Sequence, residues 1–275
     1  MSAEFRPRPN DFGLEFENVE VDSHGLVLRG WFVPAKRAAG EPAAQSAAVV
    51  VAHARYRTAG RALPLALPLH RAGFGVLMLD AHGHGASDGD IDSVTPSTLA
   101  DDLRAAIHFL ERRPDVDPER IALVGHEMGG ASAILAASRD RRIRAVVSIA
   151  AFAGGSALER RETRPEIPPI PTLLIHGGAD RHVAPSEMDR LWASSGGRAT
   201  RLLVPGRGHA GVLRDPRCAQ AMAEFLSSAL AGRVAVAAPS VTPGPAVLAA
   251  VEPRGWRRPT MWKWLQGIDY SAWGP

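Results

Sequence analysis

Six short, unbroken apolar runs follow one another through this chain, and stretches of helical character separate them. Because a strand covered on both faces can be apolar at every position, such runs favour a parallel sheet over a sheet with one wet face. Strands that alternate with helices predict a doubly wound α/β domain. The runs are AAVVVAHA (47–54), FGVLMLD (74–80), RIALVG (120–125), IRAVVSIAAF (143–152), PTLLIHG (171–177) and TRLLVP (200–205).

The segments between and before these runs complete the expected architecture. Residues 97–113 carry apolar side chains at the spacing of a helix that covers a sheet. Ahead of the first run, two β-like segments at 14–21 and 26–33 flank the turn-forming sequence DSHG (22–25) and predict an antiparallel hairpin. Further helices are expected at about 61–72, 128–139, 185–195 and 216–231.

Composition divides the chain into three parts. Residues 1–13 are polar and contain proline, so we expect an N-terminal arm ahead of a single domain at 14–232. The final part, 233–275, begins with an Ala/Val/Pro-rich stretch that is typical of a linker. It ends in a segment with four of the six tryptophans, which predicts either a lid over the domain or a clasp in a homodimer.

Charge and cysteine usage exclude several classes of function. The 32 basic and 29 acidic side chains give a formal net charge of +3, but the two signs are interleaved, as in ERRE (159–162). Nucleic-acid-binding proteins concentrate positive charge on one face, so we expect no nucleic-acid partner. The chain shows no signal sequence, no apolar run of about 20 residues, and a single cysteine, Cys218. These features predict a cytoplasmic protein that does not enter a membrane.

Three chemistry-bearing residues follow predicted strands in an order that favours a catalytic triad. GHEMGG (125–130) comes directly after a strand and opens a helix, which is the setting of a nucleophile elbow with Glu127 at its centre. Asp180 and His209 each follow a later strand. Because the carboxyl ends of parallel strands lie along one edge of the sheet, we expect these three side chains to meet there.

At these residues the chain resembles the α/β-hydrolase superfamily, in particular its small esterase-like and dienelactone-hydrolase-like members. The resemblance covers about residues 14–231 and includes LDAHGHGASDGD (79–90), HGGADRHV (176–183) and GRGHAG (206–211). It implies an α/β-hydrolase fold, with a mostly parallel eight-stranded sheet flanked by helices. About 20 residues separate the strands between which such a fold inserts a cap, so only a minimal cap is expected.

The same resemblance implies roles for individual residues. Asp180 and His209 match the acid and histidine positions, and backbone N–H groups of Met128 and of Ala54 or Arg55 would form the oxyanion hole. We expect no cofactor, and the histidine spacing supports no metal site. The residues expected to line the substrate pocket are His53, Tyr56 and His126.

The chain departs from the family at the elbow, where Glu127 stands in place of the usual serine. A carboxylate that attacked an ester carbonyl would form an anhydride, so ordinary serine-esterase activity is not expected. The helix N-terminus favours ionised Glu127. With His209 between Glu127 and Asp180, the site would hold a carboxylate base beside an imidazolium acid, which suits elimination or activation of water. Attack by Glu127 on an sp3 carbon is a third route.

The sequence therefore predicts an atypical enzyme that cleaves a small, largely apolar ester- or acyl-bearing molecule by hydrolysis or elimination. Glu127 would be its base or, as the less favoured role, its nucleophile. His209 would be its acid/base, and Asp180 would orient His209. Two alternatives stay open: a ligand-binding or scaffold protein that kept the fold after losing catalysis, and a serine hydrolase in which Glu127 was substituted for serine.

Overall fold

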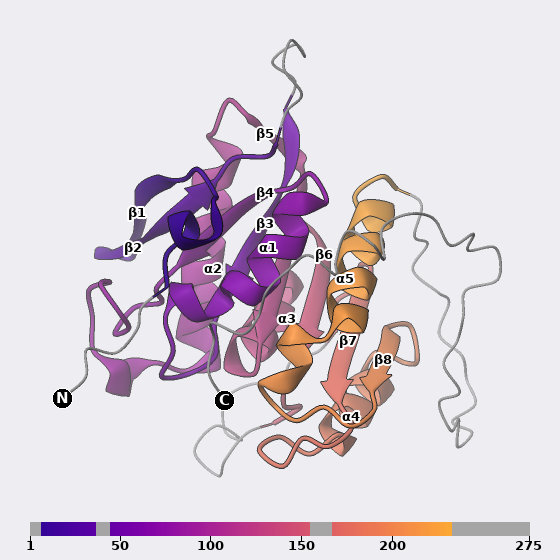
Figure 1. Ribbon diagram of the computed structural model, residues 1–275. Helices are drawn as coiled ribbons and strands as arrows, with labels where there is room; N and C mark the ends of the chain where they lie inside the picture. Colours follow the sequence, from indigo (N-terminus) through magenta and orange to yellow (C-terminus); the bar gives the residue numbers. More distant parts are fainter. Residues whose placement is uncertain (1–6, 37–44, 155–166, 233–275) are drawn as a thin grey trace.

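Eight strands form one twisted sheet in the computed structural model, which describes residues 7–36, 45–154 and 167–232 (Figure 1). The strand order is β1-β2-β4-β3-β5-β6-β7-β8, and only the pairings of β2 with β1 and β4 are antiparallel. The predicted mostly parallel sheet is confirmed. The strands are β1 (Glu17–Ser23), β2 (Leu26–Val33), β3 (Ser46–Ala52), β4 (Gly75–Leu79), β5 (Val116–His126), β6 (Ile143–Ile149), β7 (Thr172–Gly177) and β8 (Thr200–Val204).

Helices cover both faces of the sheet, which is why the central strands are apolar throughout (Figure 1). Helices α1 and α5 pack with one face, and α2, α3 and α4 pack with the other. Every residue of β4 and β7 is buried. The helices are α1 (Leu63–Arg71), α2 (Pro96–Glu111), α3 (Met128–Arg139), α4 (Ser186–Ser194) and α5 (Pro216–Ala229), with short 3-10 helices η1 (Pro9–Phe12), η2 (Ala59–Ala62), η3 (Ile91–Ser93) and η5 (Gly211–Arg214).

Helix α2 shows how local sequence and burial act together. Thr95 caps its N-terminus by accepting the Thr98 N–H, while the Thr98 hydroxyl accepts the Thr95 N–H. Pro96 occupies the first turn, where its missing N–H is not needed. Fully buried leucine and isoleucine side chains of this helix each contribute about 1.5–3 kcal/mol to the stability of the fold. These are Ile107 and Leu110.

The turn of the hairpin formed by β1 and β2 is shorter than the sequence predicted. Ser23, expected in the turn, pairs with Leu26 as the last residue of β1, so only His24 and Gly25 connect the strands. Both have positive φ, 54° and 83°, which is the geometry of a two-residue turn with the twist of the strands it joins. Buried Ser23 stays in the strand because its hydroxyl donates to Asp102 Oδ1 at 2.7 Å.

Strand β6 also ends earlier than its apolar run. Ala150 has a φ of 49°, outside the range of an extended strand, so β6 stops at Ile149. The Ala150 N–H donates instead to the Ile175 carbonyl of β7. Residues 150–152 are apolar because they are buried or half-buried beyond the carboxyl end of β6, although they are not part of the strand.

The chain ends bear on two further predictions. Of the expected N-terminal arm, residues 7–13 are described: Pro7 and Pro9 are buried, and Phe12 packs against the core. The predicted linker and tryptophan-rich tail, and most of the segment expected to hold a minimal cap, lie outside the described residues. None of the helices in the described part of the chain is long and apolar enough to cross a bilayer.

Candidate active site

Glu127 forms a sharp turn between a strand and a helix. Strand β5 ends at His126, α3 begins at Met128, and Glu127 between them has φ 55° and ψ −115°. Such a backbone is strained for a residue with a side chain and is typical of a nucleophile elbow. The turn needs two glycines, because a Cβ on Gly125 would lie 2.2 Å from the Gly129 carbonyl oxygen, and one on Gly129 would lie 2.6 Å from that of His53.

His209 and Asp180 form a hydrogen-bonded pair at the carboxyl edge of the sheet. The Nδ1–H of His209 donates to Asp180 Oδ2 at 2.8 Å. The Asp180 side chain is fully buried, whereas His209 is 21% exposed. The loops after β7 and β8 carry the two residues, so pairing of these neighbouring strands brings them together. This bond leaves His209 Nε2 available to a bound molecule.

The surroundings of Asp180 favour its anion. Burial acts to raise the pKa of Asp180, but hydrogen bonds from the Val183 N–H, the His209 ring and the His182 N–H outweigh it and hold the pKa below its usual value. The two backbone bonds reach Oδ1 at 2.9 Å and 2.8 Å. Asp180 therefore remains a fixed acceptor that orients His209.

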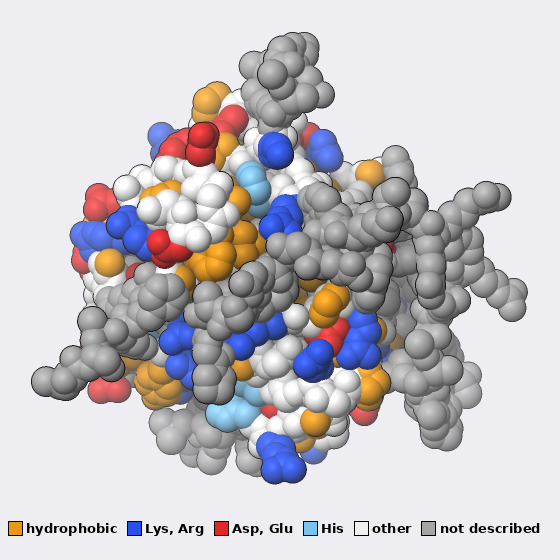
Figure 2. All heavy atoms as spheres, viewed as in Figure 1, with side chains coloured by type: hydrophobic (Ala, Val, Ile, Leu, Met, Phe, Trp, Pro, Cys, Tyr) orange, Lys and Arg blue, Asp and Glu red, His pale blue; other side chains and the backbone are white. Residues whose placement is uncertain are grey.

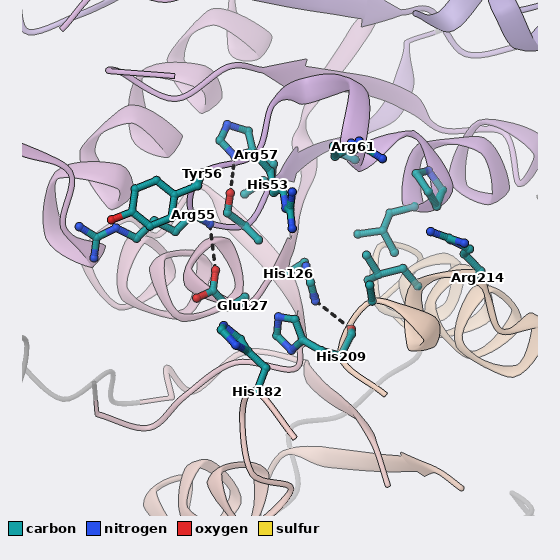
Figure 3. A pocket seen from close by; sticks show the side chains of 17 residues that line it. His53, Arg55, Tyr56, Arg57, Arg61, His126, Glu127, His182, His209 and Arg214 are labelled. Atoms are coloured by element: carbon teal, nitrogen blue, oxygen red, sulfur yellow. Dashed lines mark hydrogen bonds between the residues drawn. The ribbon is translucent and has the colours of Figure 1, made fainter. Parts of the chain in front are cut away.

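The Glu127 carboxylate does not pair with His209. Its Oε2 accepts the backbone N–H of Arg55 at 2.9 Å, and among the described residues no hydrogen bond or ion pair joins Glu127 to His209. The expected position of His209 between two carboxylates is therefore wrong for this structure. His209 forms a hydrogen bond with Asp180 but not with Glu127. A glutamate side chain is longer than the serine that is usual at an elbow, and that of Glu127 extends to the loop after β3 (Figure 3).

The loop after β3 owes its shape to two buried histidines. His53 donates from Nδ1 to the Ala54 carbonyl at 2.8 Å and accepts the Ala81 N–H at Nε2 at 3.0 Å. Burial lowers the pKa of His53 to about 4, which keeps the ring neutral and able to accept. His84 accepts the Tyr56 N–H at 3.1 Å. These bonds fix the backbone that directs an N–H group toward Glu127.

A row of three histidine rings crosses the site. The ring centroids of His126 and His182 each lie 4.6 Å from that of His209. His126 Nε2 donates to the His209 carbonyl at 3.2 Å. Burial, with the nearby His209, lowers the pKa of His126 to about 3, so its ring is neutral. His126 therefore positions the His209 backbone without adding a charge.

A cavity of about 610 Å³ opens above the elbow (Figure 3). It brings together Glu127, His209 and the loop after β3, including Ala54 and Arg55. Met128 is not among the residues that line it; its side chain is 1% exposed, and its backbone is at the first turn of α3. His53, Tyr56 and His126, which we expected in the substrate pocket, also line this cavity.

Sequence reasoning missed several other lining residues. His182, two positions after Asp180, was detectable from the motif around that carboxylate. Arg57 and Arg61 follow closely after Tyr56, whereas Arg214 comes from η5, far along the chain; no motif singled out any of the three. Within the described part of the chain, no group of three or more histidine, cysteine, aspartate or glutamate side chains is arranged to hold a metal ion.

Comparisons with known proteins agree with the fold. Residues 43–169 match the family model of serine aminopeptidase, S33. The chain is 31% identical over 238 residues to the uncharacterized protein YfhR of Escherichia coli K12, covering 78% of this chain and 81% of YfhR. It is 33% identical over 144 residues to the thiohydrolase apmlB of Arthrinium phaeospermum, covering 50% of this chain and 41% of apmlB. The Pyrococcus furiosus esterase Pf2001 superposes with a TM-score of 0.69 at 19% identity, covering 84% of this chain and 96% of the esterase.

Proposed function

The chain belongs to the α/β-hydrolase superfamily, and from that premise we propose that it hydrolyses a small ester or thioester with Glu127, His209 and Asp180. The observation that carries the proposal is that Glu127 and His209 line the same cavity of about 610 Å³, with the Asp180 hydrogen bond behind His209. The similarity to a thiohydrolase supports the choice of ester or thioester bonds.

His209 acts as the proton donor and acceptor. Its Nδ1–H is held by the buried Asp180 anion, so the ring has one orientation and presents Nε2 to the substrate. The His126 bond to the His209 carbonyl restrains the same loop from the other side. A general acid/base fixed in this way needs no reorganisation before it transfers a proton.

Glu127 acts as the base that activates water. In the substrate-free site its Oε2 accepts the hydrogen bond of the Arg55 N–H. A substrate carbonyl oxygen would take over that N–H together with the Met128 N–H, which has no intrahelical partner because it opens α3. The released carboxylate then faces the cavity, where it can accept a proton from water.

The reaction balances with these groups alone. Glu127 takes a proton from water as the water oxygen bonds to the carbonyl carbon. The bond from that carbon to the leaving oxygen or sulfur then breaks, and His209 Nε2–H protonates the leaving group. Exchange of the proton from Glu127 to His209 restores the site. One water is added, and an acid and an alcohol or thiol are released.

Two other uses of the same groups give different products. In an elimination, Glu127 would take a proton from carbon while His209 protonates the leaving group, and no water would enter the products. In nucleophilic attack on an sp3 carbon, an oxygen of Glu127 would enter the product. Turnover in ¹⁸O-labelled water separates all three: label enters the acid on hydrolysis, no product on elimination, and the protein carboxylate on nucleophilic attack.

A second candidate is a ligand-binding protein of the same fold that has lost catalysis. One observation favours it: Glu127 bonds to the Arg55 amide and not to His209. Such a protein would bind its ligand in the cavity, and replacing His209 would leave that binding intact.

Glu127→Gln and His209→Ala test the proposal against a panel of aryl esters and alkyl thioesters. Both variants should lose about 10²–10⁴-fold in kcat/KM, because each removes a proton-transfer group. Glu15→Gln and His108→Ala are matched controls, since both residues are exposed and lie outside the cavity. Full activity of Glu127→Gln on a substrate of the wild type would contradict the role of base. Absence of turnover by the wild type, with retained ligand binding by His209→Ala, would favour the second candidate.

A further inference from the structure

Among the described residues, four arginines line the candidate cavity, and Glu127 is the one carboxylate. Arg55 and Arg57 come from the loop after β3, Arg61 from η2, and Arg214 from η5. In Figure 3, Arg61 and Arg214 lie on one side of the cavity, and Glu127 and His182 lie on the other. The cationic groups therefore extend from above the elbow to the far side of the cavity.

Arg57 and Arg61 differ from many arginines of this chain in their lack of a carboxylate partner. Arg142 pairs with Asp140 and Glu111, and Arg217 pairs with Asp215. No residue that the structure describes forms an ion pair or hydrogen bond with the guanidinium of Arg57 or Arg61. Like charges repel one another, so placing Arg57 and Arg61 on one cavity, with no acidic partner among the described residues, costs free energy unless an anion binds there.

Arg61 and Arg214 come from elements that lie together on one face of the molecule. Figure 2 shows several basic side chains on the face that carries α1 and α5, with acidic side chains among them. Helix α1 follows η2 directly and contacts η5, so the chain brings Arg61 and Arg214 to the same part of this face. A field of one sign over a concave site attracts ligands of the opposite sign.

Apolar side chains from η2, α1 and η5 also line the cavity. They are Ala62, Pro64, Leu65 and Leu213. A ligand that spans from His209 to the arginines would lay an apolar spacer against these residues. The cavity is thus polar at two places, the elbow and the arginines, with an apolar surface beside them.

We infer that the substrate is an ester or thioester whose acyl group ends in an anionic carboxylate or phosphate, held by Arg57 and Arg61 with Arg214 beside them. This inference rests on the proposed hydrolysis at Glu127 and His209 and narrows the largely apolar substrate expected from the sequence. Arginine suits the task because its planar guanidinium donates two parallel hydrogen bonds to one oxyanion group. Carboxylate and phosphate share that chemistry, and the test compares them.

Three p-nitrophenyl esters supply the comparison: the monoester of glutaric acid, its neutral methyl diester, and the ester of 3-phosphonopropanoic acid. Wild type should cleave at least one anionic ester with a kcat/KM about tenfold or more above that of the neutral diester. In Arg57→Gln and Arg61→Gln, this ratio should fall by about tenfold, mainly through KM, because the anion is bound equally before and during reaction. Arg141→Gln, which removes the same charge at an exposed site outside the cavity, should keep the wild-type ratio.

Calorimetric titration with glutarate and with 3-phosphonopropanoate separates this inference from the proposed function. If no ester is cleaved but one anion binds, and Arg57→Gln and Arg61→Gln weaken that binding, the hydrolytic proposal fails and the anion site stands. If wild type cleaves neutral and anionic esters equally well, or cleaves none and binds neither anion, the anion site is wrong. Thermal unfolding of each variant checks that the fold is retained.

Discussion

The Glu127 carboxylate accepts a hydrogen bond from the Arg55 N–H at 2.9 Å. That amide is one of the two donors that we propose for an oxyanion hole, so under the proposed function a carboxylate of the protein itself occupies the place of a substrate oxygen. The elbow and the His209–Asp180 bond keep the geometry that a serine nucleophile would need. Glutamate changes the chemistry of the site through its charge and its length.

Glu127→Ser should convert the site into a Ser-His-Asp triad. A serine hydroxyl at the elbow would lie near His209, and the Arg55 N–H would become available to an oxyanion. We expect the variant to form a covalent adduct with a fluorophosphonate, seen as a mass increase of the intact protein, whereas wild type forms none. The double variant Glu127→Ser/His209→Ala is the control and should react far more slowly. An unreactive single variant would contradict the assignment of the elbow.

Asp180→Asn should abolish the correct orientation of His209. An amide NH₂ would face His209 Nδ1 and favour the neutral tautomer with the proton on Nε2, and the ring would lose the buried anion that stabilises its doubly protonated form, the proposed donor to the leaving group. A loss of about 10³–10⁴-fold in kcat/KM is expected, with a change in the ¹⁵N shifts of the His209 ring. Asp22→Asn, at an exposed position of β1, should change neither. An unchanged His209 tautomer in Asp180→Asn would count against the orienting role.

Gly125→Ala should disrupt the elbow. The added methyl would lie 2.2 Å from the Gly129 carbonyl oxygen, which belongs to the backbone of α3 and cannot move alone. We expect a loss of about 2–3 kcal/mol in the free energy of unfolding in urea. Gly154→Ala is the matched control, since its methyl would meet nothing within 4 Å, and it should change the stability by less than about 0.5 kcal/mol. Equal stability of both variants would show that the close approach of β5 and α3 is not required.

Acid should destabilise the protein through its buried carboxylates. Burial acts to raise the pKa of Asp215, but hydrogen bonds from Arg217 and Arg207 outweigh it and hold the pKa well below its usual value. A carboxylate with a folded-state pKa below its unfolded-state pKa of about 3.9 stabilises the fold above that pH, and the stability is lost as the pH falls toward the folded-state pKa.

The free energy of unfolding should therefore fall as the pH is lowered below about 4. In Asp215→Asn this dependence should be weaker, because one such carboxylate is gone, while the exposed Asp92→Asn should follow wild type. Denaturant titrations at pH 3, 4, 5 and 7 measure the difference. Identical pH profiles for Asp215→Asn and wild type would rule out a contribution from the Asp215 cluster.

Most of the fold was predictable from the sequence because the relevant signals are local. Unbroken apolar runs identify strands buried on both faces, and the stripe in 97–113 identifies α2. GHEMGG places the elbow at Glu127, since only glycine tolerates the close approaches at Gly125 and Gly129. The error at the hairpin turn has a non-local cause: β1 extends to Ser23, whose hydroxyl donates to Asp102, 79 positions away.

The sequence by itself thus determined the sheet, its helices and the order of Glu127, Asp180 and His209 along the chain. Only the tertiary structure decided that Glu127 bonds to Arg55 and not to His209, because that choice depends on the reach of one side chain within a packed site. It also decided that arginines from three separate segments line one cavity. Periodicity and turn chemistry specify elements, whereas contacts between distant residues follow from how those elements pack.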